Sequence, residues 1–233
     1  MSRLIWDEPK DRLYETGISN VVLYKQNSSG EYPEGVAWNG VTTVTESPSG
    51  ADETALYADN IKYLSLRAAE NIGGTLEAYT YPDEWKECDG RRSPIKGLEV
   101  SQQVRKSFGL AYKTILGNDI DDNDYSYKLH LFYNLTAAPS ERSYATVNES
   151  PEAITFSWTL TSTPINMPNG LKASALLTID ASKFTTVQEL KNLHDLEDIL
   201  YGKDADATEG TPATVARLPL PAEVVQVLSN PGN

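Results

Sequence analysis

Alternation of apolar and polar residues is the dominant pattern along this chain, and it predicts β-strands. The clearest case runs from Ile154 to Thr161, where every second side chain is apolar and those between them are Thr or Ser. A period of two places the apolar set on one face of a pleated strand and the polar set on the other. Alternation or Val, Thr and aromatic enrichment predicts further strands at 18–24, 36–45, 75–81, 107–115, 125–133 and 171–179.

Polar segments rich in Gly, Pro, Asn, Asp and Ser separate these strands and predict turns and loops. They span 27–35, 46–53, 117–124 and 137–151. The pair Asn39-Gly40 lies inside the predicted strand 36–45. Because Asn-Gly is a strong signal for a two-residue hairpin, the pair marks either a hairpin turn or a bulge within one strand.

Helix signals are few, and segment 183–201 carries the clearest ones. Thr186 and Glu189 fit a capping box, and Gly202 stands where a left-handed residue commonly ends a helix. Its apolar residues recur at spacings of three and four, which defines an apolar face that can pack on a sheet. These residues are Val187, Leu190, Leu193, Leu196 and Leu200.

Two shorter segments are also predicted to be helical. One is 82–88, with Pro in its first turn and Gly90 as its stop, and the other is the amphipathic stretch 222–228, which follows a polar linker at 204–212. The pattern as a whole predicts a mainly β (α+β) fold. We expect a β-sandwich or barrel-like sheet with one packed amphipathic helix and with extended loops and termini.

The charge balance limits the classes of partner. Among 233 residues there are 20 Lys and Arg against 33 Asp and Glu, a formal net charge of −13. A grip on nucleic-acid phosphates or on an anionic membrane surface needs the opposite sign. No stretch approaches the roughly 18 apolar residues of a membrane-spanning helix, and no apolar signal segment is expected near residue 1. Cys88 is the only cysteine, so no intrachain disulfide can form, which fits a reducing cytoplasm.

Residues suited to catalysis are scarce. His130 and His194 are the only imidazoles, and both fall on polar sides of their predicted elements, so we expect both at the surface. Cys88 lies between Glu87 and Asp89, whose charges raise a thiol pKa, the wrong direction for a nucleophile. The sequence therefore predicts no enzyme, no catalytic residue, no bound cofactor and no metal.

Two charged clusters each leave an alternative open. Asp119–Asp124 holds four Asp, but an EF-hand counted from Asp119 needs Gly and Glu where this chain has Asp124 and His130. We expect a solvated hairpin tip, with a weakly bound cation as the alternative. Basic residues are expected to form a salt-bridged surface or to contact the acidic C-terminal helix of a neighbouring copy. They are Arg91, Arg92, Lys96, Arg105 and Lys106.

Several short blocks of sequence, in order from Gly17 to the end, resemble the major tail protein (tail tube protein) of long-tailed bacteriophages. The resemblance is to the non-contractile, siphovirus type of Gram-positive hosts. No block alone carries a sharp chemical meaning, and the specificity lies in their shared order. The blocks are 35–42, 45–51, 56–63, 77–85, 88–90, 128–133, 138–144, 148–152 and 218–221.

This resemblance implies a structural virion protein. Six copies would close into a ring through their sheet edges, and rings would stack into a hollow tube that delivers the genome to the host cell. The implied partners are further copies of the chain, the tape measure protein in the lumen, and the tail terminator and distal tail or baseplate proteins at the tube ends. Double-stranded DNA would pass through without specific binding, along a lumen that we expect to be net negative. No membrane insertion is implied, and assembly would occur in the host bacterial cytoplasm.

The resemblance also divides the chain. It implies an N-terminal arm at 1–16, a β-sandwich tail-tube domain at 17–202 and a C-terminal extension at 203–233. Ring stacking needs a loop that leaves the sandwich, and the long polar segment from residue 46 is the best candidate. The predicted stacking loop consists of Glu46, Ser47, Pro48, Ser49, Gly50, Ala51, Asp52 and Glu53.

Other classes of function remain as alternatives. The inner tube of a contractile tail or a related injection apparatus shares the implied architecture. A carbohydrate-binding β-sandwich module would also use aromatic-rich strands, and an enzyme with an unfamiliar site is disfavoured by the few His and Cys residues. Tubes or rings in electron micrographs would separate the first reading from the last two.

Overall fold

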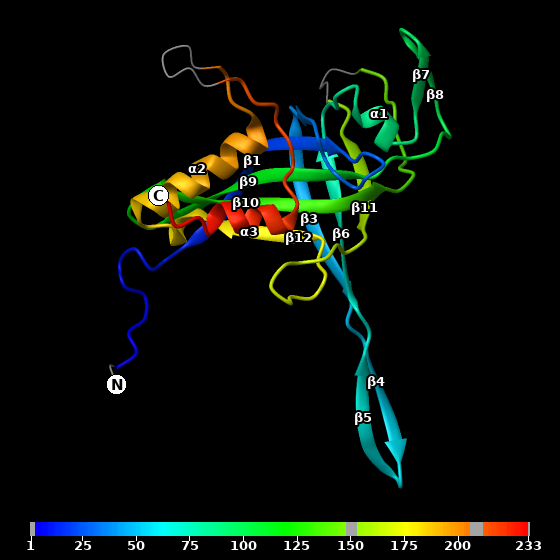
Figure 1. The fold of residues 1–233 in the computed structure, drawn as a ribbon. Helices are drawn as coiled ribbons and strands as arrows, with labels where there is room; N and C mark the ends of the chain where they lie inside the picture. The colour runs from blue at the N-terminus through cyan, green and yellow to red at the C-terminus, as the bar shows by residue number, and fades with distance from the viewer. Residues whose placement is uncertain (1–2, 148–152, 206–211, 233) are drawn as a thin grey trace.

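The computed structural model describes residues 3–147, 153–205 and 212–232, and its largest element is an eight-stranded antiparallel sheet (Figure 1). The strand order is β2-β1-β9-β10-β11-β6-β3, and β12 also pairs with β10. The mainly β prediction is confirmed. The strands are β1 (Tyr14–Lys25), β2 (Gly35–Ala37), β3 (Val41–Gly50), β6 (Glu70–Ala78), β9 (Phe108–Asn118), β10 (Asp122–Ala137), β11 (Phe156–Ser162) and β12 (Leu176–Asp180).

The long strand β10 joins the two halves of this sheet. Its residues Lys128–Phe132 pair with β12, whereas Leu135–Ala137 pair with β11. The register between β10 and β9 shifts between Phe132 and Leu135, and such a bulge bends a strand. Strands β11, β6 and β3 therefore fold over one face of β1, β9 and β10, which makes the sheet a sandwich.

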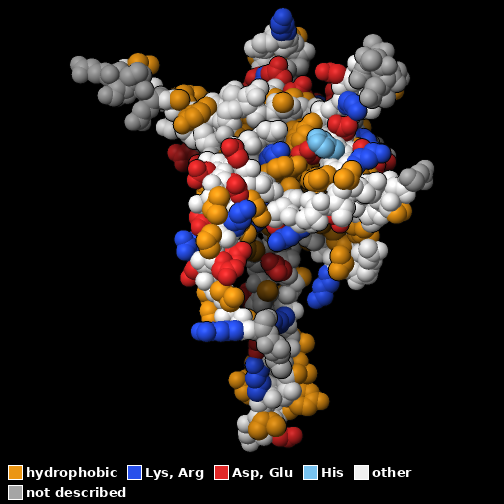
Figure 2. Space-filling view, turned by 90° about the vertical axis from the view of Figure 1, so that its left-hand side faces the viewer, with side chains coloured by type: hydrophobic (Ala, Val, Ile, Leu, Met, Phe, Trp, Pro, Cys, Tyr) orange, Lys and Arg blue, Asp and Glu red, His pale blue; other side chains and the backbone are white. Residues whose placement is uncertain are grey.

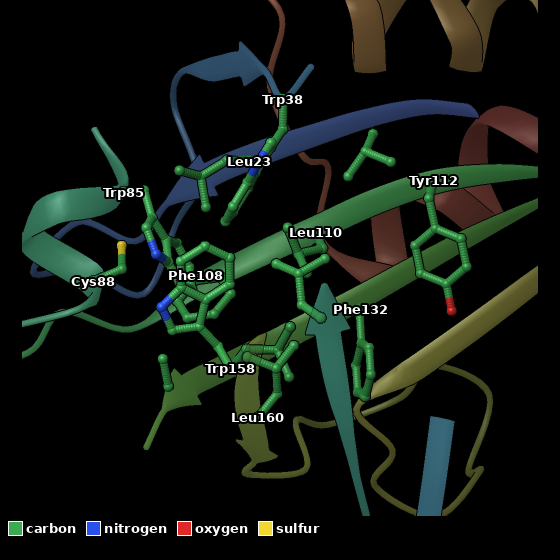
Figure 3. Close-up of a cluster of buried hydrophobic side chains, with 14 of the residues drawn as sticks. Leu23, Trp38, Trp85, Cys88, Phe108, Leu110, Tyr112, Phe132, Trp158 and Leu160 are labelled. Carbon is green, nitrogen blue, oxygen red and sulfur yellow. The ribbon is translucent and has the colours of Figure 1, made fainter. Parts of the chain in front are cut away.

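The core between the two halves is aromatic (Figure 3). Trp38 lies with its ring centroid 4.6 Å from that of Trp85 and 5.6 Å from that of Trp158. Trp158 and Leu160 of β11 are both buried, as the alternation in that segment predicts. Short helix α1 (Trp85–Cys88), inside the predicted segment 82–88, closes this end of the core with two buried side chains.

Two helices cover the opposite face of β1, β9 and β10 (Figure 1). Helix α2 (Val187–Tyr201) has the predicted capping box between Thr186 and Glu189, and a 3₁₀ turn (Ala181–Lys183) precedes it. Helix α3 (Pro221–Leu228) packs beside it, and the buried Asn192 amide donates to the backbone oxygens of Leu228 and Asn230. The predicted single packed helix is thus a pair.

Local differences from the sequence prediction have simple causes. Helix α2 begins at Val187 rather than at residue 183, because the capping residue Thr186 is itself extended. Gly202 has the expected positive φ of 78°, but its ψ of 164° is extended and so it does not form a left-handed cap. Asn39-Gly40 makes neither a hairpin nor a bulge, since β2 before it pairs with β1 and β3 after it pairs with β6.

Two hairpins leave the sandwich in opposite directions (Figure 1). One consists of β4 (Glu53–Ala58) and β5 (Ile61–Arg67), and the other of β7 (Arg92–Ile95) and β8 (Leu98–Val100). Within the described residues no helix is long and apolar enough to cross a membrane. The block 148–152, the end of the predicted polar segment 137–151 and most of the linker 204–212 lie outside the described residues.

The described part of the 203–233 segment is integrated into the fold. Leu218 and Val224 are each 2% exposed and belong to the core beneath the helices. Tyr133 of β10 donates its hydroxyl to the backbone oxygen of Pro219. The proposed three-part division of the chain stays a prediction, but this stretch packs as part of the sandwich.

Candidate assembly surfaces

The β4–β5 hairpin forms an arm that continues the β3–β6 ribbon beyond the sandwich (Figure 1). β3 and β6 pair as far as Gly50 and Glu70, and the amide of Ala68 then donates to the oxygen of Asp52 at 3.1 Å. Pairing resumes between β4 and β5 up to the turn Asp59-Asn60, whose residues both have positive φ. Positive φ at both central residues is the geometry of a type I′ hairpin turn.

The arm is amphipathic. The register pairs Leu56 with Leu64 and Thr54 with Leu66, so these side chains share one face. Leu56 is 42% exposed, Leu66 55% and Ile61 65%, and Figure 2 shows the hydrophobic side chains on the arm below the body. This apolar face consists of Thr54, Leu56, Ala58, Ile61, Leu64 and Leu66.

The opposite face of the arm carries charged residues together with Tyr57, which is 71% exposed. Glu53 accepts hydrogen bonds from Lys62 and from the Ser65 hydroxyl, and Arg67 lies 3.7 Å from its other oxygen. The bond from Lys62 is the main reason that the pKa of Glu53 is lowered. These contacts hold the two strands in register on the wetted side, so the arm presents its apolar side in a fixed orientation.

The predicted stacking loop is not a loop over most of its length. Glu46–Gly50 form the second half of β3, Ala51 and Asp52 make the joint to the arm, and Glu53 begins β4. Pro48 is compatible with this strand because β3 lies at the edge of the sheet. A role of these residues in ring stacking stays a prediction. The hairpin that leaves the body lies at 53–67, after the predicted segment 46–53.

The sequence prediction missed β4, β5 and the apolar face of the arm. A signal was present, since Leu64 and Leu66 alternate with Ser65 and Arg67 after the turn-forming pair Asp59-Asn60. The run of Ser, Gly, Asp and Glu before residue 54 resembled a loop. The apolar residues of the arm also have no buried partner in the described part of the chain, so the packing of the body gives no reason to expect them.

Both ends of the sheet offer backbone hydrogen-bonding groups. β3 is the last strand in the order and pairs only with β6 among the described residues. At the other end β2 covers only Val22–Tyr24 of β1, so the edge of Tyr14–Ser19 on that side has no strand beside it in the described chain. Open edges of this kind are templates for strand addition by another chain.

His130, predicted to lie at the surface, is buried at 7% exposure. Its ring stacks on Tyr112 with a centroid distance of 4.7 Å, its Nδ1 lies 3.2 Å from Glu46 and its Nε2 lies 3.4 Å from Glu15. The prediction was wrong because both faces of β10 are covered. The helices cover one face, and Glu46 of β3 covers the other face at His130. The cluster fastens β3 to β1, β9 and β10.

The carboxylates of this cluster are held in the ionised form. The hydrogen bond with His130 is the largest influence on Glu46 and lowers its pKa, against the effect of burial. Burial raises the pKa of Glu15, but bonds from Lys128 and Thr114 outweigh it and the net direction is down. Burial and the Glu46 carboxylate both raise the pKa of Tyr112, so its hydroxyl remains a donor to Glu46.

A second buried polar cluster surrounds Asp89. Arg142 donates to its carboxylate at 2.6 Å, Arg105 lies at 3.3 Å and Arg91 at 3.4 Å. The Arg142 guanidinium also lies over the rings of Tyr81 and Phe156. Asp89 thereby anchors the segment that follows β10 to α1 and to the approach to β7.

Cys88, His194 and Asp119–Asp124 are the other residues that the sequence analysis considered for chemistry. Cys88 is buried, and burial raises the pKa of its thiol to about 12, in the predicted direction. His194 is exposed as predicted. Among the described residues no group of three or more His, Cys, Asp or Glu is placed to hold a metal ion. Asp119–Asp121 form the turn between β9 and β10, and Asp122–Asp124 begin β10.

Comparison with known proteins gives little. No protein-family model matches the chain, and no curated protein matches it. Among solved structures, a chain of the sheath–tube complex of an extracellular contractile injection system, in its extended state, is similar to it. The likeness has a TM-score of 0.30 and 14% sequence identity over 70% of this chain and 89% of that chain. A likeness this weak carries no argument about the fold or the function of this chain.

Proposed function

We propose that this chain is the structural protein of a phage-type tail tube, of the non-contractile class. Copies close into hexameric rings, and the rings stack into a hollow tube around a tape measure protein. Terminator and distal tail proteins complete the two ends, and the genome passes through the lumen without specific binding. The protein has no enzymatic role in this proposal.

The observation that carries the proposal is the arm. A two-stranded hairpin is at best marginally stable alone in water, and this one holds an apolar face away from the body. Large exposed apolar faces mark contact sites in soluble proteins. The arm offers a contact along the direction of the β3–β6 ribbon, and the open edges of β3 and β1 offer a second contact across the sheet. Stacked rings need two such contacts, one between rings and one between neighbours in a ring.

Electron microscopy of the purified protein tests this proposal. We expect rings and tubes of uniform diameter from the wild-type chain. Replacing Glu53–Arg67 by a two-residue Asn-Gly turn between Asp52 and Ala68, which already pair, should leave a folded body that forms no tubes. A protein that stays monomeric at all concentrations, or an armless variant that still makes tubes, would contradict the proposal.

A matched pair of substitutions tests which face of the arm is used. Leu56 and Tyr57 are neighbours on β4 that point to opposite faces, and both are exposed. Leu56→Asp should abolish tube formation because it places a charge in the apolar contact. Tyr57→Asp adds the same charge on the Glu53 side and should preserve tubes. Equal effects of the two substitutions would argue against a specific apolar contact.

A further inference from the structure

The charge of this molecule is unevenly distributed. Residues 83–106, which contain α1 and the β7–β8 hairpin, hold six Lys or Arg against five Asp or Glu, although the chain as a whole is strongly acidic. The rest of the chain carries 14 basic and 28 acidic residues. This end of the molecule is therefore a positive region on a protein whose copies otherwise repel each other.

A hollow lies between α1 and the β7–β8 hairpin, with five basic and two acidic residues in its lining. Three of the basic side chains have partners: Lys86 with Asp83 and Glu99, Lys106 with Glu87, and Arg91 with Asp89 and Glu99. Arg92 and Lys96 are exposed and form no ion pair within the described residues. The hollow thus offers two positive side chains without an ion pair in the described chain beside three that have one.

The β9–β10 turn, taken together with the first residues of β10 (Asp122–Asp124), offers the opposite charge. Asp119 is engaged by the amide of Lys10 and by Arg12, and Asp121 accepts from Asn118. Asp122 and Asp124 are exposed and have no ion-pair partner in the part of the chain that the structure describes. The acidic helix α2 fits less well, because Glu197 pairs with Lys113 and Asp198 with Lys203.

The hollow and the turn lie at opposite ends of the same strand. β9 starts two residues after Lys106 and ends at Asn118, and its 11 residues span about 36 Å at the usual rise per residue. Figure 1 shows the β9–β10 turn and the β7–β8 hairpin on opposite sides of the body. One copy therefore cannot bring its own turn to its own hollow.

We propose that the basic hollow between α1 and β7–β8 receives the acidic β9–β10 turn of a second copy. The two surfaces differ, so the contact is head-to-tail, and a pair of copies keeps one free hollow on one copy and one free turn on the other. A head-to-tail contact closes into a ring when its rotation allows. This inference rests on the proposed function, because it assumes that copies of the chain assemble. It adds which surfaces of neighbouring copies touch.

Charge reversal tests the contact. Arg92→Glu with Lys96→Glu gives a hollow variant, and Asp122→Asn with Asp124→Lys gives a turn variant, since Asn tolerates the positive φ of residue 122. Each variant alone should assemble at least tenfold less than wild type. A mixture of the two should assemble, because reversed hollows face reversed turns and native hollows face native turns in alternating copies.

The control matches the change in net charge of the hollow variant but places it elsewhere on the molecule. Lys172→Glu with Lys191→Glu replaces two exposed lysines without ion pairs in the described chain and should assemble like wild type. Thermal unfolding of each purified variant checks that it is folded. Loss of assembly in this control, or failure of the mixture, would overturn the contact.

Cross-linking supplies a second readout. A chain with Lys96→Cys and Asp124→Cys, treated with a short bis-maleimide, should give a ladder of covalent multimers. Buried Cys88 should not react, and either single variant should give none of the ladder. Tubes that form without the ladder would overturn this contact and leave the tube proposal intact. A wild-type chain that never assembles would overturn both.

Discussion

The sandwich body and the β4–β5 arm use the same residue types under opposite conditions. In the body, Leu110, Phe132 and Trp158 are at most 1% exposed, and the two apolar clusters of the sheet are covered by its other half or by the helices. In the arm, Leu64 at 37% is the least exposed of its large apolar side chains. The body buries the apolar side chains of its strands within one chain, whereas the arm leaves its apolar face exposed for contact with another molecule.

This difference separates folding from assembly. Burial of a Leu or Phe side chain stabilises a fold by about 1.5–3 kcal/mol, and in this molecule that contribution comes from the body. The apolar side chains of the arm contribute little until they are covered. Substitutions in the two regions should therefore divide cleanly between effects on unfolding and effects on tube formation.

Trp158→Ala should produce the largest loss of stability. Trp158 contacts Trp38, Trp85 and Tyr81 at centroid distances below 6 Å, and its removal leaves a cavity in the centre of the aromatic core. The expected decrease in the free energy of unfolding is about 3–5 kcal/mol. Denaturant unfolding of the monomer measures it, and a decrease below 1 kcal/mol would show that this core is not the source of stability.

Arg142→Met should have the next largest effect. The substitution keeps an unbranched stem between Tyr81 and Phe156 but removes the shortest contact to the buried Asp89. Because Arg91 and Arg105 remain near that carboxylate, we expect a loss of about 2 kcal/mol, below the usual 3–5 for a broken buried pair. A wild-type unfolding midpoint would mean that Arg91 and Arg105 suffice to satisfy Asp89.

Acid should destabilise the cluster around Glu46, which joins β3 to the body, whereas the ion pairs of the exposed arm should add little to the pH dependence of unfolding. The folded-state pKa of Glu46 lies below the ordinary value of 4.5, so its contribution is complete above that value and is lost as the pH falls through the folded pKa. Glu46→Gln should flatten the decrease in unfolding free energy below about pH 4.5. Glu53→Gln on the exposed arm should leave that pH profile unchanged, as expected for a solvent-screened pair.

Leu64→Ala should have the smallest effect on the monomer, within about 0.5 kcal/mol of wild type, because its side chain is exposed. The same substitution should still reduce the yield of tubes in electron micrographs. A large loss of monomer stability would contradict the contrast between body and arm, since it would mean that the arm already packs within one chain.

The parts of the fold that the sequence predicted are those in which local pattern and burial agree. Trp158 and Leu160 alternate with Thr because one face of β11 is buried, and Thr186 with Glu189 fixes the start of α2 through local hydrogen bonds. The prediction failed at His130, whose polar neighbours suggest water but whose face is covered by Glu46 from a distant strand. Contacts of that range are not encoded in spacing.

The candidate assembly surfaces were predicted only in outline. The segment from residue 46 was expected to leave the sandwich, and the chain does leave it seven residues later, at Glu53. The apolar face of the arm depends on the register of Leu56 with Leu64, which follows from the turn at Asp59-Asn60. The basic hollow depends on α1 and β7–β8 approaching each other, and composition alone does not show that.

The shared strand β10 gives the molecule a particular response to mechanical load. A pull on the arm passes along the β3–β6 ladder from Gly50 and Glu70 to Val41 and Ala78, then through β11 into β10. The ladders are loaded along the strands, so many hydrogen bonds share the force at once instead of breaking one after another. Tension on the arm would thus reach the layer beneath α2 and α3, and the sandwich would resist it as a single unit.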